Sequence, residues 1–148
     1  MNRLSNSTKA AVIYKKGTPD VFKWEEVVVP NPNNKEVRLK NTAIGVNYID
    51  TYHRRGMPHP WPVPELPIVL GIEGVSVVEE LGADVNEFSI GDRVAYALPP
   101  HGAYSEERVY PVDKLIKVPH SLSHVSDQDL AALMLKGLTA QFLLKRTY

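Results

Sequence analysis

Residues 45–52 read Gly45-Val46-Asn47-Tyr48-Ile49-Asp50-Thr51-Tyr52, and this stretch says most about how the chain folds. An alternating run of apolar and polar residues precedes it, which is typical of a half-buried strand. Asn47 belongs to a residue type that caps helices well, so a short helix is expected to begin at Tyr48. The turn of that helix would bring Asn47 and Tyr52 onto nearby faces.

Outward from this stretch, about the first hundred residues read as short strands separated by turn residues. This pattern is typical of a sandwich or barrel rather than of βαβ units. A sheet of this kind must curl or close to hide its edges, so we expect a mainly β fold with a partly open barrel. The expected strands are Ala10–Tyr14, Val21–Val29, Glu36–Ile44, Glu73–Leu81, Arg93–Leu98, Ala103–Tyr110 and a short one at Leu115–Val118.

The composition changes near the end of the chain, where helices are expected. Ser126 and Asp127 offer capping groups directly before a run of apolar residues. Gly137 is expected to interrupt this helix, and Thr139 to cap a second one. The predicted organisation is therefore a flexible tail at 1–8, a barrel domain at 9–125 and a helical segment at 126–148.

Composition limits the function classes. The chain has 17 basic and 17 acidic residues, so its overall field favours neither nucleic acid nor an anionic membrane. It has no cysteine, which excludes a disulfide framework and a thiolate nucleophile. The polar start lacks the apolar run of a secretory signal, and no stretch reaches the roughly 20 apolar residues of a membrane span. A soluble, cytoplasmic protein is expected.

Five motifs occur in one order along the chain. They are Gly45–Tyr52, Leu70-Gly71-Ile72-Glu73-Gly74-Val75, Gly91-Asp92-Arg93-Val94-Ala95-Tyr96, Gly102-Ala103-Tyr104-Ser105-Glu106 and Leu135-Lys136-Gly137-Leu138-Thr139-Ala140. In this order they resemble the quinone oxidoreductase (zeta-crystallin-like) branch of the medium-chain dehydrogenase/reductase superfamily, from about Lys9 to Tyr148. The resemblance implies a GroES-like catalytic domain.

The resemblance also implies a second domain that binds the dinucleotide. A Gly-x-Gly-x-x-Gly phosphate-binding turn occurs nowhere in the 148 residues. Two-domain members of the family need roughly twice this length for both domains. We therefore expect that the Rossmann domain is absent from this chain, and that the chain is the N-terminal catalytic domain only.

Two positions of the resemblance concern metal. Zinc-dependent relatives carry a cysteine where this chain has Asn47 and a histidine where it has Ile72, so zinc is not expected. His120 and His124 stand four residues apart, but Pro119 makes a shared helical turn doubtful. No functional metal site is expected.

Reduction of a carbonyl without metal needs donors already in place for the charge that arrives on oxygen. Asn47 and Tyr52 suit this task as catalytic residues. In relatives the matching residues face the nicotinamide, so the resemblance implies that both also bind the cofactor. It implies the same for Lys136 and Thr139, although a salt bridge for Lys136 and a helix cap for Thr139 remain the alternatives.

The remaining candidates are less specific. The resemblance makes Asp50 and Trp61 candidates for the substrate cleft, and Trp61 lies in the proline-rich segment 58–67. Asp50 could instead accept backbone donors in its turn or pair with Arg54 or Arg93. Glu73 is either a buried carboxylate with a designated partner or an exposed residue.

The function implied is that of an NADPH:quinone oxidoreductase that works without metal, with NADP(H) as cofactor, a small quinone as substrate, and a homodimer at full length. The choice of NADPH over NADH rests on the resemblance alone. Two alternatives stay open: a metal-free enoyl or alkenal reductase of the same superfamily, and a non-catalytic GroES-like binding module.

Overall fold

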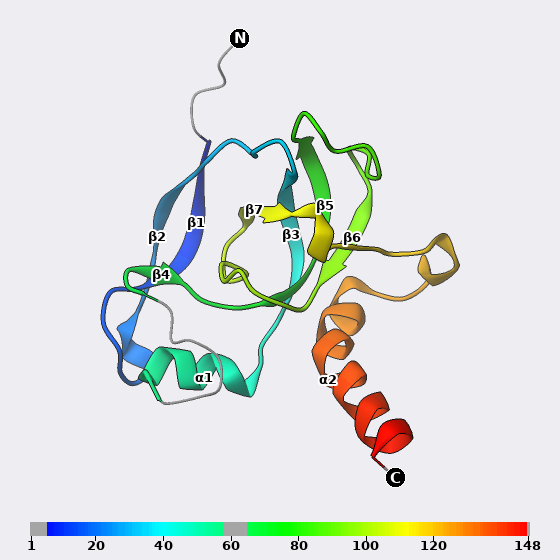
Figure 1. Cartoon of the computed structure of the whole chain (residues 1–148). Helices are drawn as coiled ribbons and strands as arrows, with labels where there is room; N and C mark the ends of the chain where they lie inside the picture. Colours follow the sequence, from blue (N-terminus) through cyan, green and yellow to red (C-terminus); the bar gives the residue numbers. More distant parts are fainter. Residues whose placement is uncertain (1–5, 58–64, 148) are drawn as a thin grey trace.

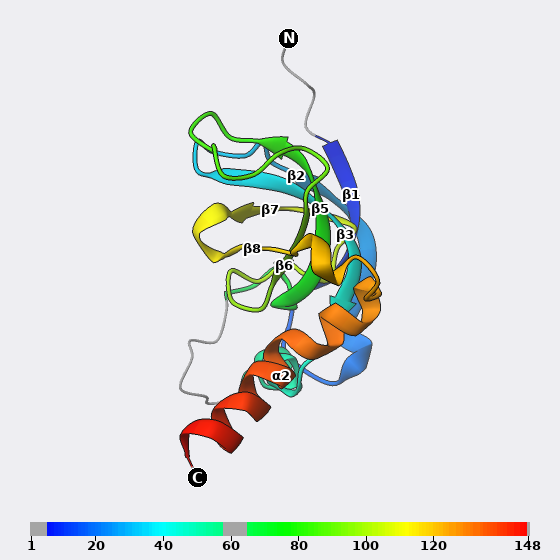
Figure 2. The ribbon, with the colours of Figure 1, turned by 90° about the vertical axis from the view of Figure 1, so that its right-hand side faces the viewer.

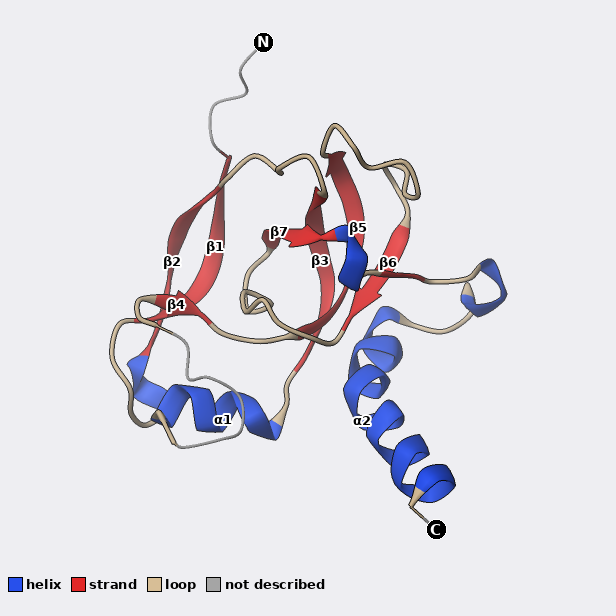
Figure 3. Cartoon of the chain, viewed as in Figure 1, coloured by secondary structure: helices blue, strands red, loops and turns tan. Residues whose placement is uncertain are grey.

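The computed structural model describes residues 6–57 and 65–147, and most of its regular structure is β (Figures 1 and 3). One sheet has the strand order β2-β1-β4, and the other has the order β7-β3-β5-β6-β8. The first sheet consists of β1 (Asn6–Ile13), β2 (Phe22–Val29) and β4 (Ile68–Val69). The second consists of β3 (Glu36–Gly45), β5 (Glu73–Leu81), β6 (Arg93–Tyr96), β7 (Glu107–Pro111) and β8 (Ile116–Lys117).

The two sheets are open, and an isolated antiparallel bridge between Ala10 and Ser105 connects them. The prediction of a mainly β fold with a partly open arrangement of strands is confirmed. The α-helices are α1 (Tyr48–Arg55) and α2 (Asp127–Arg146), and short 3-10 turns span Pro19–Val21, Val112–Lys114 and His120–Leu122. Both α-helices lie at the same end of the strands (Figure 1).

The main core lies on the inner face of the second sheet, where side chains two residues apart point the same way. On β3 this alternation buries Val37 and Leu39 completely. They pack with side chains of β5, β6 and β7, namely Val78, Val94, Tyr96 and Tyr110. A second cluster around Ile13, Val21 and Leu70 belongs to the first sheet.

Several element boundaries differ from the predictions. β1 begins at Asn6, inside the segment expected to be a tail, and β4 was not predicted because two residues carry no detectable period. α2 runs through Gly137 without a break, so the predicted interruption is wrong. Thr139 does not cap a second helix, because it lies inside α2. Its hydroxyl donates to Leu135 O of the same helix at 2.8 Å.

The first turns of α2 are attached to the second sheet. Ser126 accepts from the Asp129 N–H as the predicted cap, and Arg93 on β6 pairs with Asp127. Ala131 is buried against Val75 and Ala95. Figure 2 shows that the later turns extend away from the sheets, where Phe142 and Leu144 are exposed. Trp61 and most of the proline-rich segment lie outside the described residues.

Candidate active site

A buried carboxylate lies where the end of β3, the start of β5 and the middle of α2 meet. Glu73 has no exposed surface, and one of its oxygens, Oε2, accepts from Asn47 Nδ2 at 2.6 Å and from Lys136 Nζ at 2.9 Å. Its other oxygen accepts from the Leu135 N–H of α2 at 2.6 Å. Lys136 Nζ also donates to Asn47 Oδ1 at 3.0 Å, which closes a triangle. We call Asn47, Glu73 and Lys136 the polar triangle.

The local sequence explains how Asn47 reaches this position. Asn47 is the N-cap residue of α1, and its backbone N–H donates to Asp50 Oδ2 at 2.9 Å. Its side chain donates to Glu73 and accepts from Lys136. Asn47 therefore both begins α1 and forms part of the polar triangle. The prediction of a helix that begins at Tyr48 is confirmed.

The approach of Glu73 to the strand before the cap requires a glycine. A Cβ atom on Gly45 would overlap Glu73 Oε2 and would lie 2.6 Å from Ala131 O. The missing side chain therefore leaves the space that the buried carboxylate and helix α2 occupy.

Asp50 lies in the first turn of α1 with 4% of its surface exposed. Besides the Asn47 N–H it accepts the Tyr104 hydroxyl at 2.7 Å, and burial raises the pKa of the Asp50 carboxyl. Burial and the bond to Asp50 raise the pKa of Tyr104. The expectation that Asp50 accepts backbone donors is confirmed.

The alternative arginine partners of Asp50 are wrong. Arg54 Nε donates to Gly17 O at 3.1 Å, and Arg93 pairs with Asp127. The expectation of a buried Glu73 with a designated partner is confirmed, and Lys136 is that partner. The salt-bridge alternative for Lys136 is also confirmed, which leaves its role with a cofactor as a prediction.

The buried imidazole of His53 lies beside the half-buried imidazole of His101. His53 of α1 and His101 of the loop before β7 meet edge to face, with ring centroids 4.5 Å apart. Burial, the nearby His53 and the charge of Arg108 lower the pKa of His101 from 6.5 to about 4. His101 is therefore neutral in the folded protein at neutral pH.

We expect His101 to titrate with a midpoint of about 4 by NMR. Between pH 6.5 and 4 the unfolded chain takes up a proton at His101 that the folded chain does not, so stability falls as the pH falls through this window. The variant His101→Asn should flatten that part of the stability profile. A midpoint near 6.5, the ordinary value, would contradict the burial argument.

An open groove of about 460 Å³ lies between the start of α1 and the middle of α2. Its lining is mostly apolar, with the amide of Asn47 and the ammonium of Lys136 on the wall. The lining residues are Asn47, Tyr48, Ile49, Leu135, Lys136, Thr139, Ala140 and Leu143. A second groove, which Lys136 shares, runs along the end of β3 and the first turns of α2.

The predicted site residues are thus partly brought together. Asn47, Lys136 and Thr139 line one groove. Tyr52 is half-buried on α1, in edge-to-face contact with Tyr48 at 5.3 Å between ring centroids, and Tyr48 is the tyrosine on the groove wall. Trp61 lies outside the described residues.

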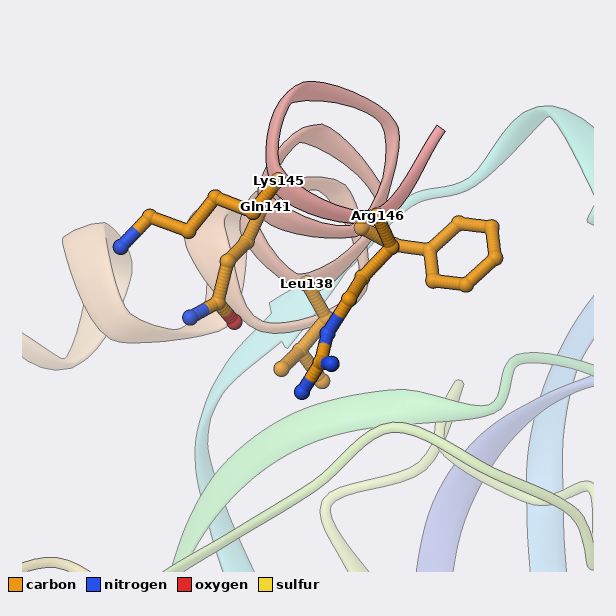
Figure 4. A pocket seen from close by; sticks show the side chains of 5 residues that line it. Leu138, Gln141, Lys145 and Arg146 are labelled. Carbon is orange, nitrogen blue, oxygen red and sulfur yellow. The ribbon is translucent and has the colours of Figure 1, made fainter. Parts of the chain in front are cut away.

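Another hollow, at the far end of α2, has a different character. Figure 4 shows Leu138, Gln141, Lys145 and Arg146, all from this one helix. Because a single helix forms the lining, no second element fixes these side chains around a ligand. We assign no site to it.

Comparison with known proteins places the chain in a family. Residues 33–120 match the model of the alcohol dehydrogenase GroES-like domain, and the chain belongs to that family. The predicted resemblance to quinone oxidoreductases of the medium-chain dehydrogenase/reductase superfamily is confirmed.

Two curated relatives illustrate the similarity. The chain is 60% identical over 139 residues to a 2-haloacrylate reductase of Burkholderia sp, covering 94% of this chain and 41% of that protein. It is 46% identical over 132 residues to a quinone oxidoreductase of Pseudomonas aeruginosa, covering 89% of this chain and 39% of that protein. The chain thus spans well under half the length of either relative.

A solved structure gives the same result in three dimensions. The crystal structure of Escherichia coli quinone oxidoreductase complexed with NADPH superposes with a TM-score of 0.85 at 38% identity. The match covers 95% of this chain and 41% of that one.

Two further observations concern metals and membranes. Within residues 6–57 and 65–147, no three His, Asp or Glu side chains come together as ligands for a metal ion. In the same part of the chain, neither α1 nor α2 is long and apolar enough to span a membrane.

Proposed function

We propose that this chain is the catalytic domain of an NADPH-dependent reductase that acts on a conjugated carbonyl compound, with a quinone as the first candidate acceptor. The observation that carries the proposal is the polar triangle, two members of which, Asn47 and Lys136, lie on the wall of an apolar groove while buried Glu73 holds them from behind. A flat, conjugated acceptor needs apolar walls for its ring and a hydrogen-bond donor for its oxygen. The groove offers both.

The residues on the groove fit a nicotinamide cofactor. Asn47 and Lys136 supply polar groups at one point of a wall that Leu135, Ala140 and Leu143 make apolar elsewhere. A nicotinamide ring has the same division, since it joins a flat face to one carboxamide. When bound, NADPH supplies a hydride. Asn47 would orient the ring, with Thr139 as a further contact and Tyr52 behind the wall.

The polar triangle also supports chemistry without metal. The charge of Glu73 is matched by the Lys136 ammonium at 2.9 Å, and the Asn47 amide is bonded to both partners. Position 72 carries an isoleucine with no exposed surface, which has no atom able to ligate a metal. We infer that hydrogen bonds, and not a Lewis acid, polarise the acceptor.

An activated alkene is the second candidate acceptor, because the identity to 2-haloacrylate reductase is 60%. Quinones and 2-haloacrylates share a C=C bond conjugated with a C=O group, so one groove and one oxygen donor serve either acceptor. Substrate-cleft roles for Asp50 and Trp61 stay predictions, as do the homodimer and the cytoplasmic location.

The experiment that tests the proposal is steady-state oxidation of NADPH by the full-length protein, with a soluble benzoquinone and with 2-chloroacrylate as separate acceptors. Turnover with either one supports the proposal, and the ratio of the two kcat/KM values decides between the candidates. A protein that folds and oxidises NADPH with neither acceptor would contradict it, and would favour a non-catalytic module.

Asn47→Ala is expected to reduce kcat/KM for NADPH by roughly 10–100-fold, because the ring loses an orienting contact. The measurement is the same assay with the NADPH concentration varied. Asn34→Ala is the matched control, since Asn34 is exposed and bonds only to Asp84 among the described contacts. Equal kinetics for the two variants would remove Asn47 from the site.

A further inference from the structure

We propose that Lys136 is a catalytic residue of this reductase, and that its ammonium donates a hydrogen bond to the oxygen of the conjugated acceptor. This inference rests on the function proposed above and adds to it the group that receives the negative charge. The glutamate of the polar triangle holds the ammonium in place and acts as a positioning residue.

The Lys136 ammonium has one N–H group more than its described partners use. A lysine ammonium has three N–H groups and accepts no hydrogen bond. In the described part of the chain, Lys136 Nζ bonds two oxygens, Glu73 Oε2 at 2.9 Å and Asn47 Oδ1 at 3.0 Å. One donor is left over.

The Lys136 ammonium can be reached from two grooves. The Lys136 side chain is 49% exposed, and it lines both the groove beside α1 and the groove along the end of β3. Its two bonds fix the position of Nζ, so the remaining donor is presented from a fixed point and not from a freely moving side chain. Preorganised donors of this kind stabilise charge without reorganising during the reaction.

Lys136 also balances the charge of a buried carboxylate. Glu73 is completely buried, so its carboxylate needs a cation nearby, and Lys136 is the cation that supplies it. Because the carboxylate is held by Leu135 N–H and Asn47 Nδ2 as well, it stays in place when Lys136 turns its third donor toward a ligand.

The electrons and protons of the reduction balance with Lys136 acting only as a hydrogen-bond donor. A hydride carries two electrons from NADPH to the conjugated carbon of the acceptor, and the π electrons move onto the carbonyl oxygen. The resulting oxyanion is an enolate, and this is the species that the Lys136 N–H stabilises. For a quinone this enolate is the keto tautomer of the hydroquinone monoanion, and it becomes that monoanion by proton exchange with water. The proton that completes the product comes from water, and no covalent bond to Lys136 forms or breaks.

The test uses a stable oxyanion, 4-nitrophenolate, as a probe of the groove in the full-length protein. We expect the wild-type protein to bind the phenolate in preference to the phenol, which lowers the apparent pKa of the bound probe in an absorbance titration. Lys136→Met should weaken phenolate binding by about tenfold or more, whereas Lys136→Arg should keep most of it. In turnover, Lys136→Met should lose about 100-fold in kcat.

The control is Lys40→Met, which removes an exposed lysine from β3 and should leave probe binding and turnover unchanged. If Lys136→Met alone is unstable, the double variant Glu73→Gln, Lys136→Met removes both charges and provides the same readout. Unchanged phenolate binding in the folded Lys136→Met variant or in the folded double variant, or no probe binding by the wild type, would overturn the inference. Failure of the wild type to oxidise NADPH with either acceptor concerns the proposed function instead, since probe binding needs no cofactor.

Discussion

Glu73→Gln is expected to lower the free energy of unfolding by about 2–4 kcal/mol, because three donors converge on a carboxylate with no exposed surface. Glutamine keeps the shape and one acceptor oxygen, which can still receive the Leu135 N–H. Its NH2 group then faces the donors of Asn47 and Lys136, and at least one of them loses its partner. The expected loss of unfolding free energy is smaller than for a fully buried ion pair, because Lys136 is half exposed and can turn toward water.

Urea unfolding monitored by circular dichroism measures this loss, with Glu79→Gln as the matched control on the same strand. Glu79 is only partly buried, so its neutralisation should change stability by less than about 0.5 kcal/mol. A second comparison uses Lys136→Met, where the buried carboxylate keeps its charge and loses its cation. Adding Glu73→Gln to that variant should recover part of the stability, and simple additivity of the two changes would mean that the pair is not coupled.

The polar triangle also marks the limit of what the sequence could predict. The order of a strand, Asn47 and a helix from Tyr48 was readable because a period of two and a capping residue are local signals. That Lys136 on α2 reaches Glu73 on β5 is a contact between residues 63 positions apart, and no local pattern encodes it. The resemblance named the residues of the triangle but not their bonds to one another.

Other parts of the site were missed for the same reason. Tyr104 appeared only as a member of a motif, yet it donates to Asp50 at 2.7 Å across 54 positions. His53 and His101 seemed unrelated along the chain, and the fold brings their rings together. A loop residue packed against a helix gives no periodic signal. The glycine that lets Tyr104 approach closely is Gly71, where a Cβ atom would lie 2.5 Å from the Tyr104 ring, and that contact is not local in the sequence either.

At Gly137 the prediction of a helix break was wrong, because it used the helix propensity of one residue where tertiary packing decides. A glycine inside a helical pattern costs about 1 kcal/mol relative to alanine, and this alone suggested a break. The helix nevertheless continues, since its first turns are held by the pair Arg93–Asp127 and by the burial of Ala131. Packing against the sheet outweighs the propensity of one residue.

Gly45→Ala is expected to lower the free energy of unfolding by about 3 kcal/mol, the upper part of the range for overpacking a filled site. The new Cβ would overlap Glu73 Oε2 and lie 2.6 Å from Ala131 O, a backbone atom of α2. Glu73 cannot yield easily because three bonds hold it, and α2 cannot move without losing the contact of Ala131 with Val75. The polar triangle would therefore be displaced along with the helix.

Gly137→Ala is the matched control for this prediction, because it adds the same methyl group to a glycine with free space around it. The nearest atom to its Cβ would be Leu133 Cβ at 3.9 Å, an ordinary contact. Removal of a helix-interior glycine should raise stability by about 0.5–1 kcal/mol. Opposite signs for the two variants in the same urea titration are the expected result. If Gly45→Ala were as stable as the wild type, then Glu73 and α2 would not pack against the end of β3 as closely as the polar triangle requires.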